Sequence, residues 1–206
     1  MPTISVDLDG YTDLPPGRIA SFVTHLEMTA PPAPAPRPVP PPGVTLERLT
    51  AADLPRYRAL FSAVGEPWLW FGRRKLSDTA LAAILADPRV EPFAVTRDDG
   101  DVGLLELDAR ATGEVELAYF GVIPSAIGAG LGRFMMATAL ARAWAHAPTP
   151  ARVTVHTCTL DHPGALAFYR RAGFVPFKFS IEVAEDPRLT GLLPRDAAPQ
   201  VPLIAP

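Results

Sequence analysis

The chain has 206 residues, which is enough for one domain of ordinary size, and a second full domain is not expected. Hydrophobic residues make up 48% and charged residues 20%, a balance typical of a globular protein. The formal net charge is -3, so no overall basic field would attract nucleic acid, and no nucleic-acid partner is expected. The single cysteine, Cys158, excludes an internal disulfide and a cysteine-rich zinc site.

The sequence also carries information about location. Residues 1–14 contain acidic but no basic side chains, so they lack the charged segment of a signal peptide. No apolar run approaches the roughly 20 residues that a membrane-spanning helix needs. A cytoplasmic protein without a membrane partner is therefore expected.

The N-terminal segment, residues 1–43, predicts a strand followed by a spacer. Residues 19–28 alternate between apolar and polar side chains, which is the period of a half-buried strand. No neighbouring segment can pair with this strand, so we expect it to join a sheet edge of its own domain or of a second subunit. Eight prolines in the twelve residues 31–42 then predict a stiff, extended connector.

Residues 44–183 predict the main domain. Strands are predicted at 44–49, 93–96, 102–108, 114–122, 153–157 and 174–183, and helices at 51–63, 77–86, about 130–146 and 163–172. The run Asp98-Asp99-Gly100-Asp101 predicts a hairpin turn. This order indicates an α/β fold with a mixed central β-sheet flanked by helices, to which the N-terminal strand and the proline-rich connector are added. The C-terminal tail, 184–206, is expected to be ordered only by docking.

A glycine-rich turn separates the strand at 114–122 from the helix that follows. Gly128, Gly130 and Gly132 let the backbone approach a ligand closely, and free amides at a helix N-terminus favour a phosphate. A dinucleotide fingerprint would need glycine where Arg133 stands and an acidic residue within 147–158, and neither is present. The nucleotide P-loop would need Gly-Lys-Ser/Thr, which is also absent. A purely structural loop remains the alternative.

Two motifs, one of which contains this turn, resemble those of a known family. The segment 116–124, followed by Gly128-x-Gly130-x-Gly132-Arg133, resembles the pyrophosphate-binding motif of the GNAT acetyltransferases, in which V-x-P precedes Q/R-x-x-G-x-G/A. Further on, His162-x-x-Ala165-x-x-Phe168-Tyr169-x-x-x-Gly173-Phe174 resembles the second signature of the superfamily, N-x-x-A-x-x-x-Y-x-x-x-G-F. The resemblance covers about residues 44–183. It implies the GNAT fold and an N-acetyltransferase that moves an acetyl group from acetyl-CoA, its co-substrate, to a primary amine by direct attack.

The resemblance also implies which residues bind acetyl-CoA. They are Val122, Ile123, Ile127, Gly128, Ala129, Gly130, Leu131, Gly132, Arg133, His162, Ala165 and Phe168. Two positions depart from the family pattern: Ile127 replaces an Arg or Gln, and His162 replaces the Asn that opens the second motif. One polar contact to the pyrophosphate is therefore missing, and the loop amides must hold it largely alone.

Two side chains are the candidate catalytic groups. Attack by an amine requires a neutral nucleophile, so a base must accept a proton. Glu116 lies six residues before Val122, where some GNAT enzymes keep a glutamate base. Tyr169 matches the tyrosine that, in many GNAT enzymes, protonates the departing thiolate. The alternatives are a solvated glutamate and a core tyrosine.

Aromatic residues mark a candidate acceptor pocket between the first two helices. Trp68, Trp70 and Phe71 lie where GNAT enzymes build that pocket, and aromatic walls suit an apolar or aromatic acceptor. The neighbouring cationic residues 73–75 could meet a carboxylate on the acceptor. A core patch or a dimer patch is the alternative, and a second copy of the chain is a candidate partner.

Other chemistries are less favoured. Cys158 could accept the acyl group, with His156 or His162 as its base, but a small apolar filler is the preferred interpretation. A metal site built from these histidines with Asp161 and Glu116 would fit no known ligand spacing, so no metal is expected. The acceptor stays open between a small-molecule and a peptide amine. A non-catalytic acyl-CoA-binding or regulatory module is the alternative function.

Overall fold

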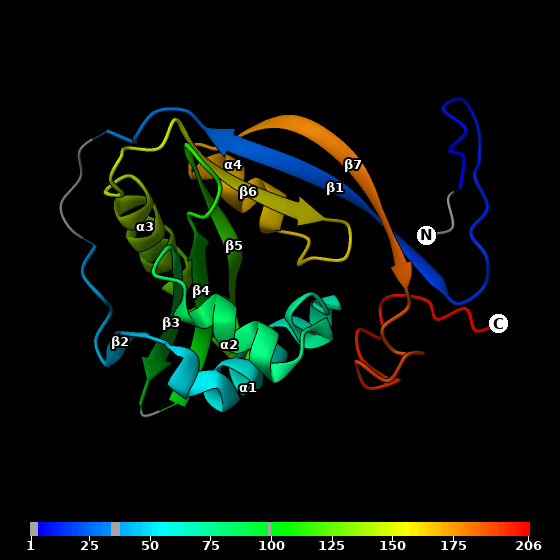
Figure 1. Cartoon of the computed structure of the whole chain (residues 1–206), viewed down its shortest axis with the longest axis horizontal. Helices are drawn as coiled ribbons and strands as arrows, with labels where there is room; N and C mark the ends of the chain where they lie inside the picture. The colour runs from blue at the N-terminus through cyan, green and yellow to red at the C-terminus, as the bar shows by residue number, and fades with distance from the viewer. Residues whose placement is uncertain (1–3, 34–37, 99) are drawn as a thin grey trace.

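The computed structural model describes residues 4–33, 38–98 and 100–206. Within these residues a seven-stranded sheet runs in the order β2-β3-β4-β5-β6-β1-β7, and helices cover its two faces (Figure 1). The predicted mixed α/β sheet flanked by helices is therefore confirmed. No helix in the described part of the chain has the length and apolar character needed to cross a membrane.

The elements follow the predicted order with small shifts at their ends. The strands are β1 (Arg18–Met28), β2 (Val44–Arg48), β3 (Val90–Arg97), β4 (Gly100–Asp108), β5 (Glu114–Val122), β6 (Arg152–Cys158) and β7 (Val175–Glu185). The helices are α1 (Leu54–Gly65), α2 (Asp78–Ala86), α3 (Leu131–Ala143) and α4 (Ala165–Arg171), with short 3-10 turns at Ala51–Asp53, Glu66–Trp68, Arg73–Lys75 and Pro124–Ala126. Asp99 of the predicted hairpin turn lies outside the described residues.

Local capping explains where the first two helices begin. The Thr50 amide donates to the Asp53 carboxylate at 2.9 Å, and the Thr50 hydroxyl accepts from the amide of Ala52, so the chain starts with a 3-10 turn before α1. The Ser77 hydroxyl accepts from the Ala80 amide at 3.2 Å, which confirms the predicted cap of α2. These caps fix the approach of both helices to the sheet.

The N-terminal strand has an unexpected place in the sheet. β1 pairs antiparallel with β6 over residues 23–28 and with β7 along almost its whole length. The strand therefore joins the sheet of its own domain, which was one of the two expected pairings. It lies inside that sheet, however, and not beside a sheet edge. The edge strand is β7. Side chains on both faces of β1 are buried, including those of Leu26 and Ser21, which fits an interior strand.

Segments outside the main domain take two different roles. The described connector residues, 31–33 and 38–42, lie in neither helix nor strand and lead from β1 to β2 at the far edge of the sheet, while 34–37 lie outside the described residues. The C-terminal tail docks as expected: Arg188 forms a buried ion pair with Asp186 and donates to the carbonyl of Val201 at 2.8 Å. Leu193 of the tail packs against Leu69.

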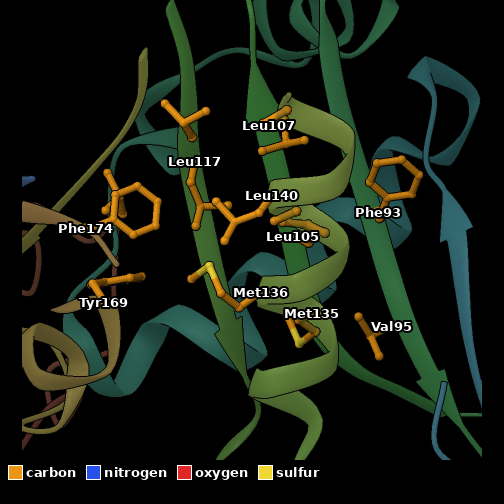
Figure 2. Close-up of a cluster of buried hydrophobic side chains, with 14 of the residues drawn as sticks. Phe93, Val95, Leu105, Leu107, Leu117, Met135, Met136, Leu140, Tyr169 and Phe174 are labelled. Carbon is orange, nitrogen blue, oxygen red and sulfur yellow. The ribbon is translucent and has the colours of Figure 1, made fainter. Parts of the chain in front are cut away.

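Two hydrophobic clusters hold the helices against the sheet. On one face, α3 contributes Met135, Met136 and Leu140, which face Leu105 and Leu117 of the sheet (Figure 2). On the other face, α1 and α2 pack on β3 and β4 through a second cluster that includes the fully buried Tyr57 and Phe61. The sheet is thereby fixed from both sides.

Candidate active site

A gap opens between two neighbouring parallel strands. β5 and β6 pair only where Glu114, Val115 and Glu116 meet residues 152–154. β5 continues to Val122 and β6 to Cys158, so beyond this short contact the two strands diverge. In the described sheet, the backbone groups on this side of β5 then have no partner strand beyond Glu116, and an extended ligand could bond to them.

A cavity of about 660 Å³ lies in this gap. Its walls come from β5, the start of α3, β6, α4, β7 and the segment after α1. This size matches pockets that hold a small-molecule ligand. The divergence of the two strands is therefore the feature that creates the site.

The glycine turn closes one end of the cavity. Gly130 caps α3 with φ 80°, and Gly128 has φ 84°, so both occupy the left-handed region that favours glycine. No atom lies within 4 Å of the point where a Cβ would stand at either residue, which leaves room for a ligand. The amide of Arg133 donates to the carbonyl of Gly130 at 3.3 Å, so the amides that precede it at the start of α3, together with the helix dipole, form a cradle suited to a phosphate.

Most of the residues predicted to bind acetyl-CoA line this cavity. They are Val122, Ile127, Gly128, Gly130, Leu131, Gly132, Arg133, His162, Ala165 and Phe168. Ile123 packs into the core instead, and the amide of Ala129 bonds to the carbonyl of Ala126 at 3.3 Å. The Ile127 side chain is 46% exposed and offers no polar atom. Arg171 of α4 also lines the cavity, and only the fold reveals that a second guanidinium joins Arg133 in its wall.

Tyr169 belongs to the cavity wall and to the core at once. Its side chain is 7% exposed, and its ring lies among those of Phe120, Phe168 and Phe174. Figure 2 shows Tyr169 beside Phe174. Burial raises the pKa of Tyr169 well above its usual value, and the charge of Asp161 adds to this effect. The phenol therefore keeps its proton at neutral pH, as a proton donor must.

Glu116 meets the cavity only through a histidine. The Nδ1 atom of His156 and the Glu116 carboxylate are 3.1 Å apart, and His156 lines the cavity whereas Glu116 is not part of its wall. The hydrogen bond to Glu116 raises the pKa of His156. In the neutral ring this bond places the proton on Nδ1 and leaves Nε2 as the free acceptor.

A second histidine stands beside this pair. The His25 ring lies 5.8 Å from that of His156, and its Nε2 atom is 2.8 Å from the Ser180 hydroxyl of β7. Burial lowers the pKa of His25, and the charge of Lys178 lowers it further. Because β1 and β7 are remote from β6 in sequence, neither neighbour could be foreseen.

The predicted aromatic residues line the other end of the cavity. Trp68, Trp70 and Phe71 are all part of its wall. The Trp70 indole donates to the Asp161 carboxylate at 3.2 Å, and the Trp68 ring meets the ring of His162 edge-on at 5.2 Å. The segment after α1 is thereby held against the loop after β6.

The cationic residues that follow do not face this cavity. Arg73 forms an ion pair with the fully buried Glu106, which also accepts from the hydroxyl of Tyr57. Arg74 donates to the Ser62 hydroxyl at 2.7 Å, and Lys75 lies over the Phe71 ring. Arg73 and Arg74 line a separate cavity of about 440 Å³. None of the three side chains is part of the wall of the first cavity, so the structure gives no support to the expectation that they meet an acceptor carboxylate there.

Cys158 lines the cavity as well, at the end of β6. Burial raises the pKa of its thiol, so the reactive thiolate is disfavoured. In the described residues, no group of three or more His, Cys, Asp or Glu side chains is placed to hold a metal ion.

Comparison with known proteins finds one family model that matches part of the chain. The model of the acetyltransferase (GNAT) domain matches residues 89–176, from the end of the α2–β3 turn into β7. No curated protein sequence matches the chain at a significant level. The match spans the glycine turn and the second motif, whereas the aromatic segment after α1 and Glu182 of β7, which also line the cavity, lie outside it.

Solved structures share the fold at low sequence identity. A GCN5-related N-acetyltransferase from Kribbella flavida is 22% identical with a TM-score of 0.53, and 85% of this chain covers 63% of that one. One from Sphaerobacter thermophilus is 20% identical with a TM-score of 0.54, and 83% of this chain covers 52% of that one. A functionally unknown conserved protein from Staphylococcus epidermidis ATCC 12228 is 13% identical with a TM-score of 0.58, and 82% of this chain covers 64% of that one. The chain thus spans less than two thirds of each structure.

Proposed function

Because residues 89–176 match the model of the acetyltransferase (GNAT) domain, we propose that the chain belongs to the GNAT superfamily and transfers an acetyl group from acetyl-CoA to a primary amine. The observation that carries the proposal is the cavity between the diverging ends of β5 and β6, with the glycine turn at one end. A pantetheine arm suits the unpaired edge of β5, and a pyrophosphate suits the amides at the start of α3. The open space at Gly128 and Gly130 supports that fit.

The chemistry divides between the two sides of the cavity. Acetyl-CoA supplies an acetyl group activated as a thioester. His156 accepts the proton of the acceptor ammonium at Nε2, directly or through a water, and Glu116 orients the ring and stabilises its charged form. In this proposal Glu116, the base expected from the sequence, supports His156 and does not itself accept the proton of the ammonium. As the new C–N bond forms and the C–S bond breaks, Tyr169 gives its proton to the leaving sulfur and regains one from the nitrogen, which loses its second proton to become the amide.

The acceptor is assigned to the aromatic end of the cavity. Trp68, Trp70 and Phe71 offer flat apolar surface, and Glu182 of β7 adds a carboxylate to the same wall. A primary amine that carries an apolar or aromatic group fits these neighbours. Small-molecule and peptide amines both satisfy this description.

The proposal is tested by incubating the full chain with acetyl-CoA and a panel of amines while free CoA thiol is measured. We expect thiol release that depends on the amine and is strongest for amines with apolar or aromatic substituents. Acetyl-CoA binding without turnover on any amine would instead support a non-catalytic acyl-CoA-binding module. Absence of binding would refute both functions.

The roles of His156 and Glu116 are separated by their pH profiles. His156→Gln should lower kcat by roughly 10²-fold, the usual contribution of a general base. Because His156 acts when neutral, activity rises as pH increases through its pKa. Glu116→Gln removes the group that raises this pKa most, so the rise should move to lower pH, although Asp161 and Glu182 still act in the same direction.

His25→Gln is the matched control. His25 is the neighbouring histidine on the same face of the sheet, but it is not part of the cavity wall. Its replacement should leave the pH profile near that of the wild type. A His156→Gln enzyme with normal kcat on a good amine would remove His156 from the mechanism.

A further inference from the structure

The two edges of the sheet are very different. β2, at one edge, has five residues, and Glu47 and Arg48 end it with charges. β7, at the other edge, has eleven residues and leaves large apolar side chains in solvent: Val175 (63% exposed), Phe177 (42%), Phe179 (62%), Ile181 (53%) and Val183 (40%). Natural proteins protect edge strands by keeping them short or by placing charges and proline on them. β2 is short and charged, whereas β7 is long and leaves an apolar row in solvent, although Pro176, Lys178 and Glu182 also lie along it.

The exposed surface extends onto the neighbouring strand. Phe22 of β1 is 47% exposed, and its ring lies 5.1 Å from that of Phe179. In Figure 1, β1 and β7 run together as a long ribbon that projects beyond the rest of the sheet. Within the described residues β7 pairs with β1 alone, so the backbone groups along its outer side have no partner strand. Exposed apolar surface with free backbone groups is typical of a protein interface.

The sequence of β7 is complementary to itself when two copies run antiparallel. Ser180 is the middle residue of Val175–Glu185, so pairing centred on Ser180 overlaps the entire strand. In this register Lys178 lies opposite Glu182 of the other copy, and the twofold symmetry repeats that charge pair. Phe179 lies opposite Ile181 of the other copy, an aromatic and β-branched pair of the kind that stabilises sheets. A register shifted by two residues loses the charge pair.

We propose that the chain forms a homodimer in which the two β7 strands pair antiparallel about Ser180 and join the two sheets into one. The opposite charges of Lys178 and Glu182 select this occupant and this register over an unrelated peptide. Glu182 also lines the cavity, so the partner's Lys178 lies at the cavity rim. The proposal does not depend on acetyl transfer, because it concerns the edge of the sheet alone.

Charge reversal tests both the dimer and its register. Sedimentation of the wild-type chain over a range of concentrations should show a species of twice the 22.1 kDa monomer mass. Lys178→Glu should weaken the dimer at least about tenfold, because each of the two symmetric pairs becomes a repulsion. Glu182→Lys should do the same. The double variant Lys178→Glu with Glu182→Lys should restore the wild-type dimer, since it exchanges the partners of each pair.

The control and the contradicting results are distinct. Arg97→Glu reverses a charge on β3, in the other half of the sheet, and should leave the dimer intact. Both altered side chains on β7 are exposed, so thermal melting of each variant should stay near that of the wild type. A wild-type chain that stays monomeric, or a dimer that neither single reversal weakens, overturns the proposal. A double variant no better than the single variants overturns the register.

Discussion

The two ends of the cavity are built in different ways. The glycine end is one continuous stretch, residues 124–133, that joins a strand to the helix after it. The aromatic end gathers segments from the whole chain: Leu69 packs against Leu193 of the tail, Gln200 bonds to the carbonyl of Pro67 at 2.7 Å, and Trp70 bonds to Asp161. A local change should therefore act locally at the glycine end, whereas the aromatic end depends on distant segments.

The largest expected effect comes from removing β1, because this strand joins β6 to β7 and so connects distant parts of the chain. Deleting residues 1–28 takes an interior strand from between β6 and β7 and removes the fully buried Leu26. We expect no cooperatively folded protein, as judged by thermal melting followed by circular dichroism. Deleting residues 1–14, which precede the strand, is the control and should leave the melting temperature nearly unchanged. A stable protein after the longer deletion would show that β1 is dispensable.

At the glycine end, Gly130→Asp should abolish acetyl-CoA binding while the fold survives. The added side chain enters open space beside the predicted pyrophosphate, and its negative charge repels that group. Gly113→Asp is the matched control, because Gly113 also has a positive φ, 74°, and open space around it but lies in the turn between β4 and β5. Calorimetry should show binding lost in the first variant and retained in the second. Equal affinities would refute the site.

Tyr169→Phe should have a smaller effect, on the rate alone. The ring and its packing are kept, so only the proton donor is lost, and kcat should fall by roughly 10²-fold with little change in the affinity for acetyl-CoA. Tyr57→Phe gives the contrast, because the hydroxyl of Tyr57 donates to the buried Glu106. That variant should lose about 1–3 kcal/mol of stability with little change in kcat. Wild-type kcat for Tyr169→Phe would leave Tyr169 as a packing residue.

The smallest effect is expected for Cys158→Ser. The partly buried thiol has a raised pKa, and direct attack by the amine does not use it. Activity in the amine assay should stay near that of the wild type. Mass spectrometry that detects an acetylated Cys158 intermediate in the wild-type enzyme would instead show that the acetyl group passes through the thiol.

The sequence by itself determined the local features of this protein. Residues a few positions apart decide the order of strands and helices, the Ser77 cap and the glycine turn. The spacing of these residues can therefore be recognised in the sequence. Gly128 and Gly130 could be singled out because few other residues adopt their backbone conformation. Trp68, Trp70 and Phe71 could likewise be assigned to the cavity wall through their position between the first two helices.

Only the tertiary structure decided which distant segments meet. An alternating strand such as β1 fits an edge or an interior position equally well by its pattern, and its place between β6 and β7 depends on pairing across more than half of the chain. The same holds for the site. Glu116 and His156 lie on strands that diverge just beyond them, and that divergence decides that the histidine faces the cavity while the glutamate supports it.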